Sequence, residues 1–172
     1  TRISLDARKK DAIAFSYTLE VTLSDKDEAR LVKKGFSHAA DTFHMEPKFG
    51  VVPLDKPIIV VGLGPAGLFA AYTLAEYGYK PIVIERGKCV DERRKDVQDF
   101  WHNARLNPNS NVMFGEGGAG TFSDGKLTTR IKDPRSRLVI DLLARFGAPD
   151  EIRIMAKPHI GTDYLVKIVE NM

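Results

Sequence analysis

The sequence predicts an α/β fold with parallel strands, preceded by a small α+β module. Residues 58–61 form a β-branched run without polar alternation, which is typical of a strand buried on both faces of a parallel sheet. A glycine-rich turn at 62–67 follows and opens an alanine-rich helix over 68–77. A second apolar run ends at Glu85, so the order is strand, turn, helix, strand. These features indicate one βαβ unit of a Rossmann-like domain.

The N-terminal segment has a different pattern. Residues 13–23 alternate strictly between apolar and polar, which predicts a half-buried strand. Ser24, followed by acidic residues, predicts the start of a short helix that ends at Gly35. The buried face of the strand is expected to hold Ile13, Phe15, Tyr17, Leu19 and Val21. Residues 36–55 are irregular, so we divide the chain into an α+β module at 1–55 and the N-terminal part of the Rossmann-like domain at 56–172.

Three further helices are predicted after the βαβ unit, at 91–103, 134–146 and 163–172. The first presents Val97, Phe100 and Trp101 at helical spacing, which favours a role in the core. Between the first and second helices lies a long irregular stretch at 106–132, rich in Asn, Gly and Ser. An irregular segment of this length in a compact domain is usually functional.

Composition limits the functional classes. The net charge of +3 over 172 residues gives no reason to expect nucleic acid or a membrane surface as partner. The single cysteine, Cys89, excludes an internal disulfide, fits a reducing compartment and is expected to be a small buried thiol. The chain has neither an apolar run of about 18 residues nor a signal-peptide core. We therefore expect a cytoplasmic protein.

The glycine turn carries the clearest chemical signal. It reads GxGxxG between a buried strand and a helix, with an acidic residue at the end of the next strand, which predicts dinucleotide binding. Gly62 allows the tight turn, Gly64 leaves room for a pyrophosphate, and Gly67 lets the helix approach the strand. The helix start, with Pro65 and Ala66, offers backbone N–H groups to phosphate. Glu85 is expected to bind the ribose hydroxyls and to repel a 2′-phosphate, an effect that Arg86 only partly offsets.

A second glycine-rich segment lies at 114–127, with five glycines between Gly115 and Gly125. Successive backbone N–H groups in such a loop can form an anion-binding concavity. Lys126 could place a positive charge beside the pyrophosphate. The side chains of Thr121, Ser123 and Asp124 could hydrogen-bond a polyol such as ribityl. The candidate backbone donors are Gly117, Gly118, Ala119 and Gly120.

With these motifs in place, the chain resembles the bacterial FAD-dependent oxidoreductases called NAD(FAD)-utilizing dehydrogenases. The resemblance rests on ISLDARKK at 3–10, VVGLGPAGLFAA at 60–71, ERG at 85–87, NVMFGEGGAGTFSDGKL at 111–127 and KPHIGTD at 157–163. It implies FAD as cofactor, with Gly62, Gly64, Gly67 and Glu85 on its ADP half and the second loop beside the pyrophosphate and ribityl chain. It also implies a dehydrogenase of unassigned substrate, with NAD(P)H as a reductant. Because the family's proteins have several hundred residues, we expect residues beyond Met172 to complete the domain.

No catalytic residue is assigned from the sequence. The four histidines, His38, His44, His102 and His159, lack metal-ligand spacing, so no metal site is predicted. His159 lies in the KPHIGTD segment, where positioning or packing is favoured over catalysis. Two alternatives stay open: a protein that binds only NAD, and a flavoprotein whose residues 1–55 bind RNA or a protein. That module has nine Lys/Arg and nine Asp/Glu, so it shows no basic bias for RNA.

Overall fold

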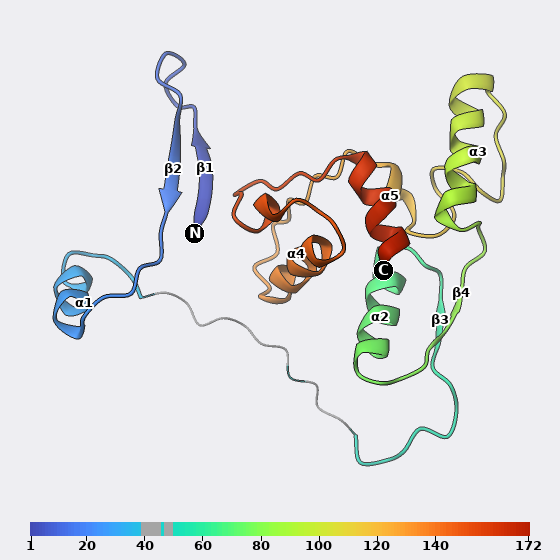
Figure 1. Ribbon diagram of the computed structural model, residues 1–172, viewed down its shortest axis with the longest axis horizontal. Coiled ribbons are helices and arrows are strands. Elements are labelled where there is room, and N and C mark those ends of the chain that lie inside the picture. The colour runs from blue at the N-terminus through green and yellow to red at the C-terminus, as the bar shows by residue number, and fades with distance from the viewer. Residues whose placement is uncertain (39–45, 47–49) are drawn as a thin grey trace.

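The computed structural model describes residues 1–38, 46 and 50–172. Part of the predicted irregular stretch at 36–55 lies outside these residues, and so does His44. The elements in chain order (Figure 1) are β1 (Arg2–Asp6), β2 (Ala14–Thr18), α1 (Asp25–Val32), β3 (Ile59–Val61), α2 (Pro65–Glu76), β4 (Ile82–Ile84), α3 (Val90–Asn103), the 3₁₀ helix η1 (Ala119–Phe122), α4 (Arg135–Arg145), the 3₁₀ helix η2 (Asp150–Arg153) and α5 (Thr162–Asn171).

β1 and β2 form an antiparallel hairpin in which Leu5 lies opposite Phe15 and Ile3 opposite Tyr17. The predicted strand over 13–23 is therefore shorter than expected, because β1 offers only five residues for pairing. The prediction of a buried face is wrong. The side chains concerned are 59 to 64% exposed: Ile13, Phe15, Tyr17, Leu19 and Val21.

α1 begins and ends as its sequence predicts. Ser24 is the N-cap, and its Oγ accepts a hydrogen bond of 3.3 Å from the backbone N–H of Asp27. The chain turns away at Gly35, which has a left-handed φ of 90°. α1 contains no buried residue, so local capping rather than packing accounts for its boundaries.

The hairpin is joined to the rest of the chain through the outer edge of β1. The N–H of Ile3 donates to the carbonyl of Ile154 at 2.7 Å, and the N–H of Ala156 donates to the carbonyl of Ile3 at 2.8 Å. Sequence reasoning missed both β1 as a strand and this parallel bridge. The N-terminal module is thus held by backbone hydrogen bonds and not by its apolar face.

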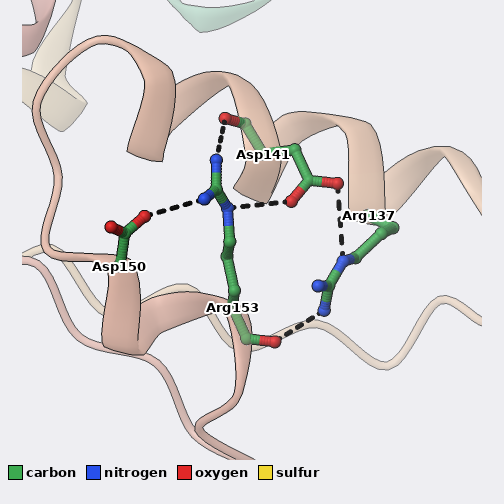
Figure 2. Close-up of polar contacts among 4 residues, drawn as sticks. All are labelled: Arg137, Asp141, Asp150 and Arg153. Atoms are coloured by element: carbon green, nitrogen blue, oxygen red, sulfur yellow. Dashed lines mark hydrogen bonds and ion pairs between the residues drawn. The ribbon is translucent and has the colours of Figure 1, made fainter. Parts of the chain in front are cut away.

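Ion pairs hold the segment that receives β1 (Figure 2). Arg153, in η2, contacts Asp141 of α4 at 3.1 Å and Asp150 at 2.7 Å. Arg137 donates to the carbonyl of Arg153 at 2.6 Å. The two arginines therefore fix η2 against α4, immediately before the residues that bridge to β1.

β3 and β4 pair in parallel, with α2 connecting them, so the predicted strand, turn, helix and strand are present. The prediction that both strands are buried on both faces is wrong. Val61 is 80% exposed, and Ile59, Ile82 and Ile84 are also exposed. The sheet has two strands in the described part of the chain, and α2 packs against β3.

The core lies around α5. Ile168 belongs to one apolar cluster, with Leu143 of α4 and Ile152 of η2. Val166 and Val169 face a second cluster, which includes Val90 at the start of α3. α5 therefore contributes to both clusters, and the segment between α3 and α4 can pack upon it.

Two predictions about buried side chains are wrong. Only Val97 of the predicted apolar face of α3 is buried, whereas Trp101 is 57% exposed and touches Phe122 edge to face. Cys89 is also exposed, because it occupies the N-cap position of α3, outside the first turn. Within the described ranges, no helix is both long and apolar enough to cross a membrane.

Candidate functional site

The glycine turn between β3 and α2 has the local geometry that the fingerprint requires. Gly62 has a φ of 87°, in the left-handed region, and its N–H donates to the carbonyl of Ile84 at 2.7 Å. A β-carbon on Gly67 would lie 1.9 Å from the carbonyl oxygen of Gly62. Any other residue at 67 would therefore push α2 away from the strand end. The packing roles predicted for these two glycines agree with the structure.

Gly64 differs from Gly67 because it borders open space. A β-carbon there would meet no atom within 4 Å, although Gly64 is the N-cap of α2. No side chain caps this helix, and Pro65 at its start has no N–H. The amides of Ala66 and Gly67 in the first turn are therefore oriented toward the helix N-terminus without a side-chain acceptor. An anionic group fits this end of α2.

Glu85 follows β4 and is held beside the turn. Its carboxylate accepts hydrogen bonds from the N–H of Leu63 at 2.6 Å and of Gly87 at 2.8 Å. Partial burial alone would raise the pKa of Glu85, but the N–H groups of Gly87, Leu63 and Arg86 and the charge of Arg93 outweigh it. The pKa therefore lies below its ordinary value, and the group stays an anion that can still accept from hydroxyls.

The second glycine segment lies directly on the first. The N–H of Gly117 donates to the carbonyl of Leu63 at 2.7 Å. A β-carbon on Gly118 would lie 3.0 Å from the Cα of Gly64, and one on Gly120 would lie 3.7 Å from Pro65. Two motifs that are separated by about fifty residues in the sequence thus form one backbone-lined corner.

Arg93 of α3 organises this second loop, and the sequence analysis missed it. The side chain is fully buried and donates to the carbonyls of Asn111, Val112 and Glu116 at 2.7 to 2.8 Å. Its guanidinium also lies over the ring of Phe122, 4.8 Å from the centroid. Arg93 lies in a run of mixed charges at 91–96, a pattern that is typical of a solvated helix face. The available signal was spacing, since residue 93 lies between positions 90 and 97 on the apolar side of the helix.

Glu116 and Arg86 complete the surroundings of the corner. A carboxylate oxygen of Glu116 accepts from the N–H of Val90 at 2.7 Å and so caps α3. Arg86 lies over the ring of Phe114, with 4.4 Å between guanidinium carbon and centroid. Both Arg86 and Phe114 are exposed, and Arg86 directly follows Glu85 in the chain.

The side-chain hydroxyls that were predicted to bind a polyol are either buried or hydrogen-bonded within the loop. Thr121 is buried against Gly117, where a β-carbon would lie 2.1 Å from its Oγ1. Ser123 donates its hydroxyl to the carbonyl of Gly120 at 2.8 Å. Ala119, at the start of η1, is exposed. The structure therefore assigns the first two side chains to shaping the loop.

Asp124 and Lys126 lie farther along the loop, where it meets the KPHIGTD segment. They form an exposed ion pair of 2.7 Å, and Lys126 also makes an antiparallel bridge to His159. Hydrogen bonding to the Lys126 ammonium and, less strongly, the charge of His159 hold the pKa of Asp124 below its usual range. The pKa of Lys126 is raised, mainly by Asp124. The structure thus brings His159 to this pair, although the sequence did not group them.

The corner suits a dinucleotide and offers nothing comparable for a metal. Three features match the needs of a pyrophosphate followed by a ribose. They are the open space beside Gly64, which we call the Gly64 cradle, the uncapped N-terminus of α2 and the fixed Glu85 carboxylate. Across the part of the chain that the structure describes, no group of three or more His, Cys, Asp or Glu side chains could hold a metal ion.

Comparison with known proteins gives one informative similarity. The chain is 50% identical over 171 residues to a protein of Clostridium beijerinckii named "Uncharacterized protein". The match covers 98% of this chain and 32% of the relative, so the chain spans about a third of that protein's length. No family model matches the chain.

Proposed function

We propose that this chain is the FAD-binding part of a flavin-dependent oxidoreductase. The observation that carries the proposal is the contact between the two glycine segments, in which Gly117 and Gly118 meet Leu63 and Gly64. This contact surrounds the open α2 N-terminus with backbone and leaves the Gly64 cradle free. Such an arrangement supports binding of a pyrophosphate, as in dinucleotide cofactors.

Glu85 supports an adenosine half without a 2′-phosphate. Because the carboxylate remains charged and lies beside the turn, it would accept hydrogen bonds from ribose hydroxyls and repel a phosphate group. FAD is preferred over NAD because the second loop extends the polar surface beyond the corner, which gives the flavin half of the cofactor a place to lie. When bound, flavin supplies the redox chemistry, and the protein supplies orientation and electrostatics.

The proposal includes a substrate for the whole enzyme and a cytoplasmic setting. The substrate is a small molecule whose oxidation or reduction the flavin couples to a nicotinamide. The cytoplasmic setting rests on the free, exposed thiol of Cys89, which suits a reducing compartment.

A binding titration with a matched pair of variants tests the proposal. The whole protein is titrated with FAD, NAD, NADP and ADP, with flavin fluorescence and calorimetry as readouts. Gly64→Leu should abolish FAD binding and leave the fold intact, because the β-carbon of the new side chain would enter open space with no protein atom within 4 Å. Ala70→Leu, on the exposed face of the same helix, should bind FAD normally.

Each result has a distinct meaning. FAD and ADP binding that Gly64→Leu removes would support the proposal. NAD binding without FAD binding would favour the nicotinamide alternative. Normal FAD binding by a folded Gly64→Leu variant would overturn the assignment of the corner as the pyrophosphate site.

A further inference from the structure

A set of polar side chains lies on the surface where the second loop pairs with the KPHIGTD segment. The N–H of Leu127 donates to the carbonyl of Pro158, and the N–H of Ile160 donates to the carbonyl of Gly125, each at 3.0 Å. Between these two hydrogen bonds, Lys126 and His159 lie opposite each other as a non-hydrogen-bonded antiparallel pair. In such antiparallel pairs the two side chains share one face and approach closely.

Burial shows which face this is. Ile160 is in the core, and Leu127 packs against it, so the neighbouring positions on both segments point inward. Lys126 and His159 consequently point outward, and both are exposed. Asp124 lies on the same face because its carboxylate holds the Lys126 ammonium at 2.7 Å. We call Asp124, Lys126 and His159 the outer cluster.

The scaffold beneath the outer cluster is tightly built. A β-carbon on Gly125 would lie 2.7 Å from the backbone N of Gly161, so the two segments meet backbone to backbone. Thr162 donates its hydroxyl to the carbonyl of Ser123 at 2.7 Å. These contacts fix the cluster on paired backbone rather than on a free loop, which is the support that a reacting group needs.

The same loop connects the outer cluster to the cofactor corner. Gly120 lies against Pro65, and Asp124 follows it by four residues, so the two ends are at most about 14 Å apart. A ribityl chain followed by a fused-ring flavin bridges a distance of this order. The flavin end of a cofactor anchored at Gly64 can therefore reach the cluster.

On this basis, and resting on the proposed function, we propose that His159 is the proton-transferring residue of the enzyme and that Lys126 holds an oxygen of the substrate. The substrate class is a small alcohol or hydroxy acid. Bound flavin would supply the two-electron oxidant, so oxidation of the substrate's H–C–O–H unit would break the C–H bond and remove that hydrogen as a hydride. It also breaks the O–H bond, whose proton passes to His159, and a carbonyl forms. Lys126 has three N–H donors, of which Asp124 uses one, so two remain for the substrate.

The first experiment asks whether the flavin half covers the cluster. Carbethoxylation of histidines by diethyl pyrocarbonate is followed by mass spectrometry on the free chain, with ADP and with FAD, while FAD binding is measured in the same samples. At about ten times the dissociation constant, FAD should slow modification of His159 by about tenfold, because free sites become rare. ADP should protect His159 little, since it lacks the flavin half. His38 and His102 are internal controls that neither ligand should protect.

The second experiment asks whether His159 takes up the proton. The FAD-loaded chain is photoreduced near neutral pH, and proton uptake is measured with an indicator dye. If His159 is the proton-transferring residue, His159→Gln should take up fewer protons per flavin than the parent chain. His102→Gln should leave uptake unchanged.

The outcomes separate this inference from the function it rests on. If FAD binds but leaves His159 as reactive as before, or if His159→Gln takes up as many protons as the parent chain, the role of the cluster is overturned and the cofactor assignment stands. If FAD does not bind at any concentration, the proposed function fails and the inference fails with it.

Discussion

The β1–β2 hairpin and the glycine loop at 111–127 contrast in composition and in burial. The hairpin carries regularly alternating apolar side chains, yet Leu5, Phe15 and Tyr17 are exposed. The loop is rich in glycine and polar residues, yet Asn111 and Thr121 are buried. An apolar pattern therefore describes what a segment could bury, whereas close backbone packing depends on partners and on the absence of side chains.

The largest expected effect comes from removing the buried side chain that holds the glycine loop at 111–127. Arg93→Met removes a buried donor from three loop carbonyls and should lower the free energy of unfolding by at least about 3 kcal/mol. Denaturant unfolding followed by circular dichroism measures it. Lys95→Met, on the exposed side of the same helix, should change stability by less than about 0.5 kcal/mol. Equal losses in both variants would contradict the buried role of Arg93.

A pair of glycine substitutions compares the two regions directly. Gly35 and Gly117 both have left-handed φ angles, of 90° and 79°. Gly35→Ala meets no neighbouring atom and should cost about 1 kcal/mol through backbone strain alone. Gly117→Ala would also place its β-carbon 2.1 Å from Thr121 and 2.8 Å from Val169, which should add about 2 kcal/mol. If both variants lost the same stability in thermal and denaturant unfolding, crowding around the loop would have to be discarded as an explanation.

Glu85→Gln should have a smaller effect, of about 1 to 2 kcal/mol near neutral pH. The amide has one acceptor oxygen, so its NH₂ group would face one of the two N–H donors of Leu63 and Gly87. Because the pKa of Glu85 is lowered by folding, its contribution is complete above the ordinary carboxyl range and is lost as pH falls through the folded value.

Unfolding measured as a function of pH checks this expectation. The parent chain and Glu85→Gln should converge in stability as the pH falls. Asp6→Asn in the hairpin is the matched control, because the Asp6 carboxylate is partly exposed and its pKa is lowered mainly by a hydrogen bond from the exposed Arg8 side chain, a surface pair whose contribution solvent screens. That variant should match the parent at neutral pH. A stability gap for Glu85→Gln that stays constant from neutral to acid pH would contradict the assigned cause.

The smallest effect is expected at the hairpin face. Phe15→Thr keeps a good strand former and removes an exposed ring, so the free energy of unfolding should change by less than about 0.5 kcal/mol. Val97→Ala in α3 is the buried counterpart, and its free energy of unfolding should fall by about 1 to 2 kcal/mol. A large loss for Phe15→Thr would show that the face is covered in solution.

Local chemistry was predictable from the sequence, and tertiary partners were not. Ser24, Gly62 and Gly67 occupy the predicted positions because capping, left-handed turns and close helix approach depend on a few neighbouring residues. The buried role of Arg93 depends on carbonyls about twenty residues away. The exposure of Val61 depends on which strands pair with β3. Neither follows from a local pattern.

The same limit applies to the candidate site. The first glycine turn and Glu85 could be found because a fixed spacing encodes their geometry. The grouping of Asp124, Lys126 and His159 could not, because it arises from a single antiparallel bridge between distant segments. The glycine content of residues 115–125 correctly indicated that their backbone makes close contacts. The structure adds that part of what it approaches is the protein itself.

The parallel bridge between Ile3 and Met155 also bears on the order of folding. These residues are 152 positions apart, whereas the hairpin closes across fewer than ten. Closing the longer loop costs about 2 kcal/mol more chain entropy, because the cost grows with the logarithm of loop length. The hairpin can therefore form early by itself, while its attachment must wait until η2 is fixed on α4. The first strand of the chain is thus among the last to reach its place.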